Sequence, residues 1–170
     1  MKFRPDRELL LCFFLATAAG MGLHFLFDLW PSLLTEFISP VNESLWEHVK
    51  LIFWPCLLAG AWLTGRGKWR AGPWLGSLLL VCALLLGAGW LLHRTLGTDA
   101  LALDVSLYLL LMGLAFFLPA VLPVPERWTG TLAAGVIILG GLIVCWTIQP
   151  PNAALFHDMT LTDAFLRLPC

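Results

Sequence analysis

Long apolar runs separated by short polar segments make up most of this chain. Five runs are long enough to form helices of about 20 residues that cross a bilayer. They lie at about residues 9–30, 43–64, 73–92, 101–122 and 128–148. The pattern predicts an all-α, polytopic membrane bundle of five transmembrane helices, formed by a single transmembrane domain over residues 1–170. Residues 149–170 contain no further run of that length and are expected to form a tail outside the membrane.

The first apolar run has two interpretations. Ala16-Thr17-Ala18 is similar to the cleavage site of a secretory signal peptide, which follows a short apolar region. Here the apolar run continues through Gly22–Phe27, which makes it long enough to cross the bilayer. We therefore interpret it as an uncleaved transmembrane helix.

The second run begins with unusually polar residues. Ser39-Pro40 is typical of an N-cap followed by proline at the first helical position, which predicts a helix from about Pro40 to Thr64. Pro31–Ile38 is then a connecting loop. Pro55 inside this helix removes one backbone hydrogen bond and predicts a kink.

Composition agrees with the membrane class. Hydrophobic residues make up 59% of the chain and charged residues 12%, where soluble domains have roughly 25% charged residues. With a net charge of −1 and no basic run, nothing indicates a nucleic-acid partner. The five cysteines include no C-x-x-C pair, so neither a disulfide framework nor a thiolate zinc site is expected.

The basic residues predict the orientation. Seven lie on one side of the expected spans, and only three lie on the other: Lys2, Arg4, Arg7, Arg66, Lys68, Arg70 and Arg127 against Lys50, Arg94 and Arg167. The positive-inside rule places the first set, and the N-terminus, in the cytoplasm and the C-terminal tail outside.

Most titratable residues fall on the outer side in this topology. All four histidines are there, with eight of the eleven acids: Asp28, Glu36, Glu43, Glu47, Asp99, Asp104, Asp158 and Asp163. A charge in hydrocarbon costs about 2.5–3.5 kcal/mol on insertion scales, so these side chains are expected to converge on one another or on a water-filled cleft.

Helical spacing groups these residues further. His24 and Asp28 are four residues apart on the first helix, and Glu43 and Glu47 are expected to share a face of the second. We expect His24, Asp28 and His48 to bind a divalent metal, zinc above others, because imidazole and carboxylate suit that ion. Glu43 or Glu47 would act as general base. Further residues are expected to bind substrate or support the ligands: Asn42, Ser44, Lys50, Asp104 and His157.

Simpler readings exist for the same residues. Asn42, Glu43 and Glu47 near a helix N-terminus also serve capping and the helix dipole. Glu43, Glu47 and Lys50 would equally form a solvated ion-paired face, and a hydrogen bond to another helix would satisfy Asp104. The spacings match none of the common metal-binding or nucleophile motifs, such as H-E-x-x-H.

Three segments resemble a family of small bacterial membrane proteins of unknown function: His24-Phe-Leu-Phe-Asp28, Ser39-Pro-Val-Asn-Glu-Ser-Leu-Trp-Glu-His-Val-Lys50 and Gln149-Pro-Pro-Asn-Ala-Ala-Leu-Phe-His-Asp158. The Asn42–Lys50 stretch is the specific part. Where the family pattern continues with a Pro-x-x-Gly turn, this chain has Met159-Thr160. The resemblance implies a multi-pass protein of the inner (cytoplasmic) membrane and supplies no activity.

Three functions remain open from the sequence. The first is a metal-dependent hydrolase acting on a lipid or lipid-linked substrate at the outer leaflet, suggested by the one-sided histidines and acids. The second is a small transporter, suggested by Asp104 and the Pro55 kink. The third is a non-enzymatic assembly protein whose polar cap is structural.

Overall fold

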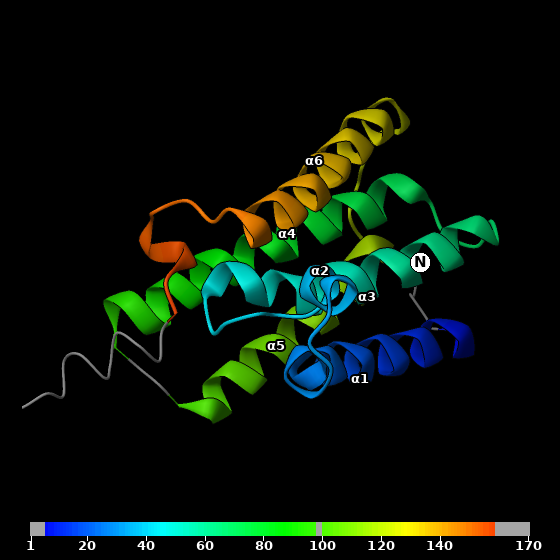
Figure 1. The fold of residues 1–170 in the computed structure, drawn as a ribbon. Helices are drawn as coiled ribbons and strands as arrows, with labels where there is room; N and C mark the ends of the chain where they lie inside the picture. The colour runs from blue at the N-terminus through cyan, green and yellow to red at the C-terminus, as the bar shows by residue number, and fades with distance from the viewer. Residues whose placement is uncertain (1–5, 98–99, 159–170) are drawn as a thin grey trace, which may run out of the picture.

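The computed structural model describes residues 6–97 and 100–158, and every regular element within those ranges is helical (Figure 1). The α-helices are α1 (Arg7–Leu29), α2 (Leu33–Ile38), α3 (Leu45–Gly65), α4 (Ala71–Gly89), α5 (Leu101–Phe117) and α6 (Thr129–Ile148). The other helical segments are the π-helix η1 (Trp90–Thr95) and the 3-10 helices η2 (Leu118–Ala120), η3 (Glu126–Trp128) and η4 (Ala154–Phe156). The expected all-α class is confirmed.

Four helical segments are long and apolar enough to cross a membrane: Arg7–Leu29, Ala71–His93, Leu101–Ala120 and Glu126–Ile148. They indicate a multi-pass membrane protein. The expected second span, α3, is not among them, because its first two turns carry Glu47, His48 and Lys50. A total of five spans therefore stays a prediction.

The central helix of the bundle is α3. It packs along α1 and α4 and also contacts α5 and α6, and Figure 1 shows it between α1 and α4. Its side chains Val49, Ile52 and Leu63 are completely buried. Because protein surrounds α3 on several sides, its polar residues pack against neighbouring helices.

The start of α3 corrects the sequence prediction. The N-cap is Ser44, whose hydroxyl accepts a hydrogen bond from the Glu47 backbone N–H at 3.3 Å, whereas Ser39 is the C-cap of α2. Residues 33–38, expected as loop, form α2. Ser39-Pro40 resembles a helix start, but the Ser39 hydroxyl bonds to α1 and does not cap α3. The true cap is five residues further on.

Helices α1, α3 and α5 approach closely at one glycine. A Cβ atom on Gly20 would lie 2.2 Å from the Tyr108 hydroxyl and 2.4 Å from the Leu51 carbonyl oxygen. That hydroxyl donates a hydrogen bond to the Thr17 carbonyl at 2.8 Å. The Leu51 carbonyl has Pro55 four residues ahead, which supplies no N–H. The backbones of α1 and α3 can therefore approach each other closely because Gly20 has no side chain.

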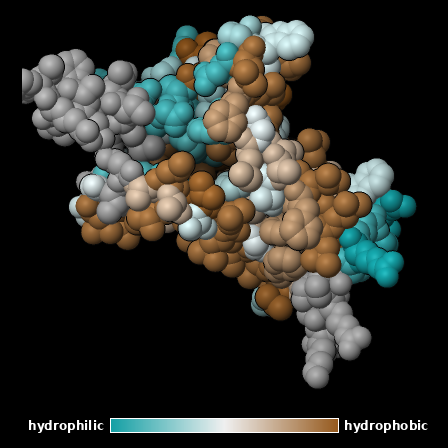
Figure 2. All heavy atoms as spheres, turned by 90° about the horizontal axis from the view of Figure 1, so that it is seen from below, coloured by the Kyte–Doolittle hydropathy of each residue, from teal (hydrophilic) through white to brown (hydrophobic). Residues whose placement is uncertain are grey.

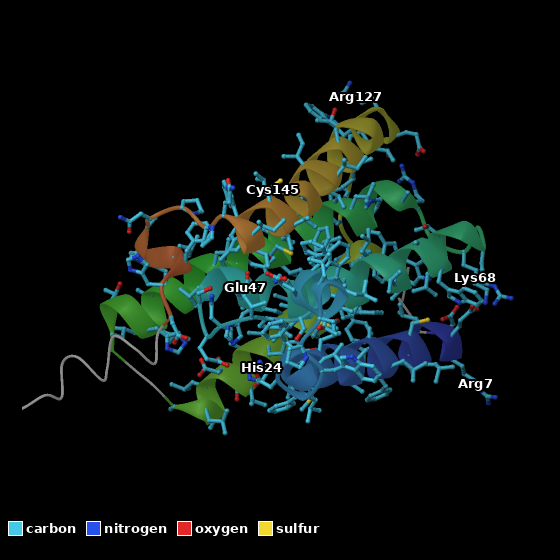
Figure 3. The ribbon with its side chains drawn as sticks, viewed as in Figure 1. Arg7, His24, Glu47, Lys68, Arg127 and Cys145 are labelled. Carbon is cyan, nitrogen blue, oxygen red and sulfur yellow. The ribbon has the colours of Figure 1, made fainter. Side chains whose placement is uncertain are left out.

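Ion pairs hold the helix ends together on one side of the bundle. Glu8 at the start of α1 pairs with Lys68 and, at 3.3 Å, with Arg66 after α3. Arg70 before α4 pairs with Glu126 before α6 at 2.9 Å. Arg7, Lys68 and Arg127 lie on this side in Figure 3, away from His24. The described residues of the predicted cytoplasmic set thus gather at one end.

A broad hydrophobic surface covers the bundle between its ends. Figure 2 shows this surface over one face of the molecule, with hydrophilic residues towards the ends. Large exposed side chains of α1 and α5 contribute to it, including Phe14, Leu15, Leu101 and Leu110. Such an apolar exterior is expected of helices that face lipid.

Candidate metal centre

Three potential metal ligands meet at the end of the bundle opposite the basic residues. His24 lies near the end of α1, Glu43 in the loop before α3 and His48 in the first turn of α3. One ligand atom from each lies within 4.8 Å of the other two. Each of the three side chains is partly buried. This is the candidate group found among residues 6–97 and 100–158.

His48 presents its Nε2 atom to the group. The Nδ1 atom lies 2.8 Å from the Ser44 carbonyl oxygen, and because a carbonyl only accepts, Nδ1 carries the hydrogen. In a neutral ring Nε2 then holds a lone pair, yet it faces the Glu43 Oε2 atom at 3.3 Å. Two acceptors at that distance repel each other unless a proton or a metal cation lies between them.

The spacing of the three residues suits a tetrahedral ion. Two ligands bound at 2.0–2.2 Å to a tetrahedral zinc ion are about 3.3–3.6 Å apart. The 3.3 Å between His48 Nε2 and Glu43 Oε2 falls in this range, and His24 Nε2 lies slightly further out, 3.9 Å from Glu43 Oε1. The residues present therefore fit a divalent metal with small side-chain adjustments.

The Glu43 carboxylate is held in its charged form. The adjacent His48 imidazole is the largest influence and lowers the pKa of Glu43, and the nearby charge of His24 acts in the same direction. Partial burial and the negative charge of Asp158 oppose this shift without reversing it. An ionised carboxylate is the form that binds a cation.

Ser39 ties the loop before α3 to α1 beside His24. Its hydroxyl donates to the Leu23 carbonyl at 2.5 Å and accepts from the Phe27 N–H at 3.1 Å. In a regular helix these two groups would bond to each other, so the hydroxyl is inserted into the backbone ladder of α1. Ser39 itself is completely buried, and its two bonds fix the turn of α1 that carries His24 relative to the loop that carries Glu43.

Replacing Ser39 by alanine should destabilise the protein by about 0.5–1.5 kcal/mol, because the hydrogen bonds that join the loop to α1 are lost while the Leu23 carbonyl and the Phe27 N–H can still bond to each other. Unfolding in mixed detergent micelles would measure this loss. Ser106→Ala is the matched control, since the Ser106 hydroxyl is exposed and bonds to the Ala102 carbonyl of its own helix. Equal effects of the two substitutions would contradict the bridge.

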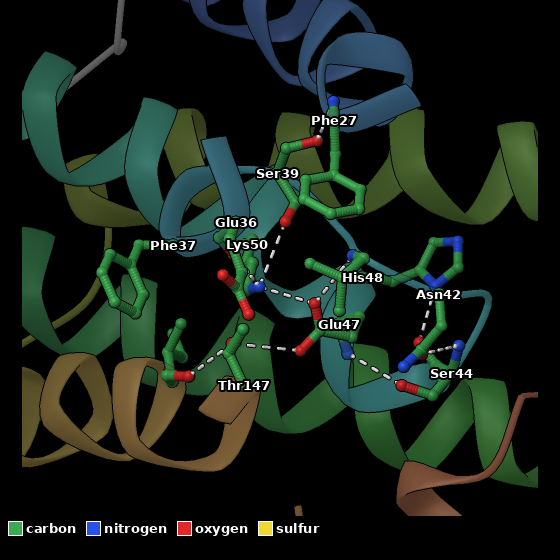
Figure 4. A network of polar contacts seen from close by, with 12 residues as sticks. Phe27, Glu36, Phe37, Ser39, Asn42, Ser44, Glu47, His48, Lys50 and Thr147 are labelled. Atoms are coloured by element: carbon green, nitrogen blue, oxygen red, sulfur yellow. Dashed lines mark hydrogen bonds and ion pairs between the residues drawn. The ribbon is translucent and has the colours of Figure 1, made fainter. Parts of the chain in front are cut away.

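A second polar network lies deeper in the bundle (Figure 4). The Lys50 ammonium donates to the Glu47 carboxylate at 2.5 Å and to the carbonyls of Glu36 and Ser39 at 2.7 and 3.1 Å. Glu47 also accepts hydrogen bonds from the Val41 N–H at 3.0 Å and from the Thr147 hydroxyl at 3.2 Å. All three donors of Lys50 are used, and the pair connects α2, α3 and α6.

The structure separates Glu47 from the three-residue group. The sequence prediction that Glu43 and Glu47 share a helix face is wrong, because α3 begins only at Leu45. Glu43, outside the helix, turns towards His48, while Glu47 is 3% exposed and points inwards. The predicted role of either carboxylate as a general base remains untested.

The remaining predicted residues occupy separate positions near the site. Asn42 accepts a hydrogen bond from the Ser44 N–H at 3.0 Å, so both shape the start of α3. The Asp104 carboxylate lies 2.8 Å from the Nε2 atom of His93. His157 Nε2 lies 3.2 Å from Asn152 Oδ1 in the tail.

Asp28 lies apart from the group. Its side chain is exposed at the end of α1, and among the described residues it is not a member of the three-residue cluster. Its predicted place as a ligand stays a prediction, whereas Glu43, expected as a base, has the position expected of a ligand.

The first residues of the tail fold back onto α3. The rings of Trp46, Trp146 and Phe156 pack against one another in tilted and edge-to-face arrangements, with centroids 4.8–5.3 Å apart. This aromatic contact fastens η4 beside the start of α3. The tail beyond Asp158, including Met159-Thr160, lies outside the described residues.

Sequence reasoning missed Ser39 and Thr147 as partners of the polar networks. Ser39 was interpreted as a cap, and Thr147 lies in an apolar run where its hydroxyl also bonds to the Ile143 carbonyl of its own helix. The available signal was Lys50, with Glu47 three residues before it, in a helix expected to lie in the membrane. A buried pair of charges needs further hydrogen-bond donors and acceptors from other elements.

Comparisons with known proteins place the chain in a family without assigning an activity. Searches of curated proteins and of solved structures find no match. A model for a family of unknown function, DUF6512, matches residues 5–164. The expected membership of an uncharacterised family is thereby confirmed, while the bacterial origin stays a prediction. Because the match covers nearly the whole chain, the protein belongs to the family of unknown function DUF6512.

Proposed function

We propose that this membrane protein binds a divalent metal ion through His24, Glu43 and His48 and hydrolyses a lipid or lipid-linked substrate at the outer leaflet. The observation that supports the proposal is the approach of three ligand atoms from α1, the loop and α3 to within 4.8 Å of one another. Two imidazoles and one carboxylate form the ligand set of several zinc hydrolases, in which the fourth position stays open.

Zinc is the metal that this ligand set favours. The group contains nitrogen and oxygen ligands and no thiolate, which suits a borderline divalent ion. A bound zinc ion lowers the pKa of water to about 7 and so supplies a nucleophile near neutral pH. His24 and His48 would hold the ion, and Glu43 would neutralise part of its charge.

The orientation follows from the placement of charge. We propose that α3 also crosses the membrane, as a fifth span, because it lies centrally among the apolar helices. The basic end with Arg66, Lys68 and Arg70 is then cytoplasmic by the positive-inside rule. In this orientation the N-terminus is cytoplasmic and the metal centre lies at the outer leaflet, at the depth of lipid headgroups.

We assign Glu47 and Lys50 a supporting role in this proposal. Both side chains are buried and fully hydrogen-bonded, so neither is available to a substrate without breaking the pair. Their network also gives specific support to the alternative function, a non-enzymatic assembly protein whose polar cap is structural. The two functions differ in whether the protein requires a metal.

Elemental analysis of the purified protein tests the proposal. After stripping with a chelator and reloading with zinc, the wild type should hold about one ion per chain, and His48→Ala should bind zinc at least about tenfold more weakly. His157→Ala is the matched control, because this exposed histidine lies outside the group. Absence of stoichiometric metal in both wild type and His48→Ala would refute the metal centre.

The hydrolase part has its own readout. Zinc-loaded wild type in micelles should cleave a fluorogenic lipid ester or phosphoester, and His48→Ala should not. Stoichiometric zinc binding with no cleavage above the His48→Ala background for either ester would refute the hydrolase and leave the metal centre intact.

A further inference from the structure

An open groove runs along α1 and α3 at the end of the bundle opposite the candidate metal centre. Its volume is about 710 Å³, within the range of small-ligand sites. The wall from α1 carries Leu11, Leu15 and Ala19, which recur every fourth residue and so follow one face of the helix. The wall from α3 includes Pro55 and Leu58.

The mouth of the groove is basic. Arg7 and Arg66 both line it, at the start of α1 and the end of α3. Arg66 is partly neutralised by Glu8 at 3.3 Å and lies over the Trp62 ring at 5.0 Å. Glu8 also lines the groove, and Arg7, which is exposed and has no carboxylate partner among residues 6–97 and 100–158, adds positive charge in excess of this single acid.

The length of the groove matches one leaflet. Twelve residues separate Arg7 from Ala19, which corresponds to about 18 Å of helix. Half of a hydrocarbon core of about 30 Å is about 15 Å, so an acyl chain lying along α1 would extend from the headgroup depth to the bilayer centre. One residue beyond Ala19, α1 and α3 come into close contact at Gly20.

We propose that this groove binds one anionic phospholipid, with its phosphate at Arg7 and Arg66 and an acyl chain along Leu11, Leu15 and Ala19. Three features select this occupant: a cationic mouth, an apolar channel of one leaflet's length, and an opening on the lipid-facing side of the bundle. The site shares no residue with the candidate metal centre, so neither proposal depends on the other.

Lipid retention tests this site. The full-length protein is reconstituted in nanodiscs of phosphatidylcholine with a minor fraction of phosphatidylglycerol, then released into mild detergent and analysed by native mass spectrometry. The wild type should retain one phosphatidylglycerol in preference to phosphatidylcholine. Arg7→Gln should lower this preference about fivefold, the contribution of one basic residue near an anionic surface.

Matched variants separate the groove from general effects. Arg127→Gln removes a positive charge at the same end, outside the groove, and should retain the lipid as wild type does. Ala19→Leu should fill the channel and abolish retention, while Ala18→Leu, exposed on α1 but not lining the groove, should not. Equal retention of both lipids by the wild type, or unchanged retention in Arg7→Gln and Ala19→Leu, would overturn the proposal.

Discussion

Lys50→Met is expected to destabilise the protein by about 3–5 kcal/mol, the range observed when one partner of a buried ion pair is removed. The Lys50 side chain is completely buried, and that of Glu47 is 3% exposed. Removing the ammonium leaves the Glu47 carboxylate without its counter-ion and the carbonyls of Glu36 and Ser39 without a donor. Unfolding of the detergent-solubilised variant, followed by circular dichroism, would measure the loss.

Two comparisons make this expectation specific. Lys68→Met removes an exposed lysine from an ion pair with Glu8 and should cost less than about 1 kcal/mol. The double variant Glu47→Leu/Lys50→Met removes both charges and should regain much of the stability, because the desolvation cost disappears along with the attraction. A double variant as unstable as Lys50→Met would show that the uncompensated Glu47 charge is not the cause.

The buried pair also positions the candidate metal centre. Lys50 holds the carbonyls at the end of α2, and Glu47 holds the Val41 N–H of the loop that follows. Glu43 lies two residues beyond Val41, so its place beside His48 depends on the path of this loop. The interior network is therefore connected to the site through the backbone and not through a shared ligand.

Much of the fold could be predicted from hydrophobic runs. Four of the expected spans coincide with helices that are long and apolar enough to cross a membrane, because a helix satisfies its own backbone hydrogen bonds in lipid. The exception is instructive. Helix α3 combines charged residues with apolar ones, and its burial among other helices depends on tertiary packing that a local pattern does not contain.

The candidate site could be predicted only in part. His24 and His48 were identified because they fall, with most of the acids, on the predicted outer side of the spans, and the structure brings them together with Glu43. Which of Glu43 and Glu47 lies beside the two histidines depends on where α3 begins. A helix beginning at Pro40 would put both acids on one face, whereas the cap at Ser44 leaves Glu43 in the loop. A difference of five residues in the start of the helix therefore moves Glu43 from a helix face shared with Glu47 to a position beside His24 and His48.

Gly20→Ala is the other substitution with a large expected effect. The added Cβ would meet the Tyr108 hydroxyl at 2.2 Å and the Leu51 carbonyl oxygen at 2.4 Å, distances that packed atoms do not adopt. The hydroxyl ends a side chain that could move, but Leu51 contributes rigid backbone of the central helix. We expect a loss of about 3 kcal/mol, at the upper end for overpacking, measured as for Lys50→Met.

Gly22→Ala provides the control on the same helix, since a Cβ there meets nothing within 4 Å. That substitution should be neutral or slightly stabilising, because alanine favours the helix by up to about 1 kcal/mol over glycine. Adding Tyr108→Phe to Gly20→Ala removes the closer contact and leaves the one with Leu51, so stability should recover only in part. Full recovery of stability would show that the clash with the Tyr108 hydroxyl, and not the approach of the two backbones, is what requires glycine at position 20. Partial recovery would establish that α1 and α3 are fixed against each other by their main chains, one helical turn from His24.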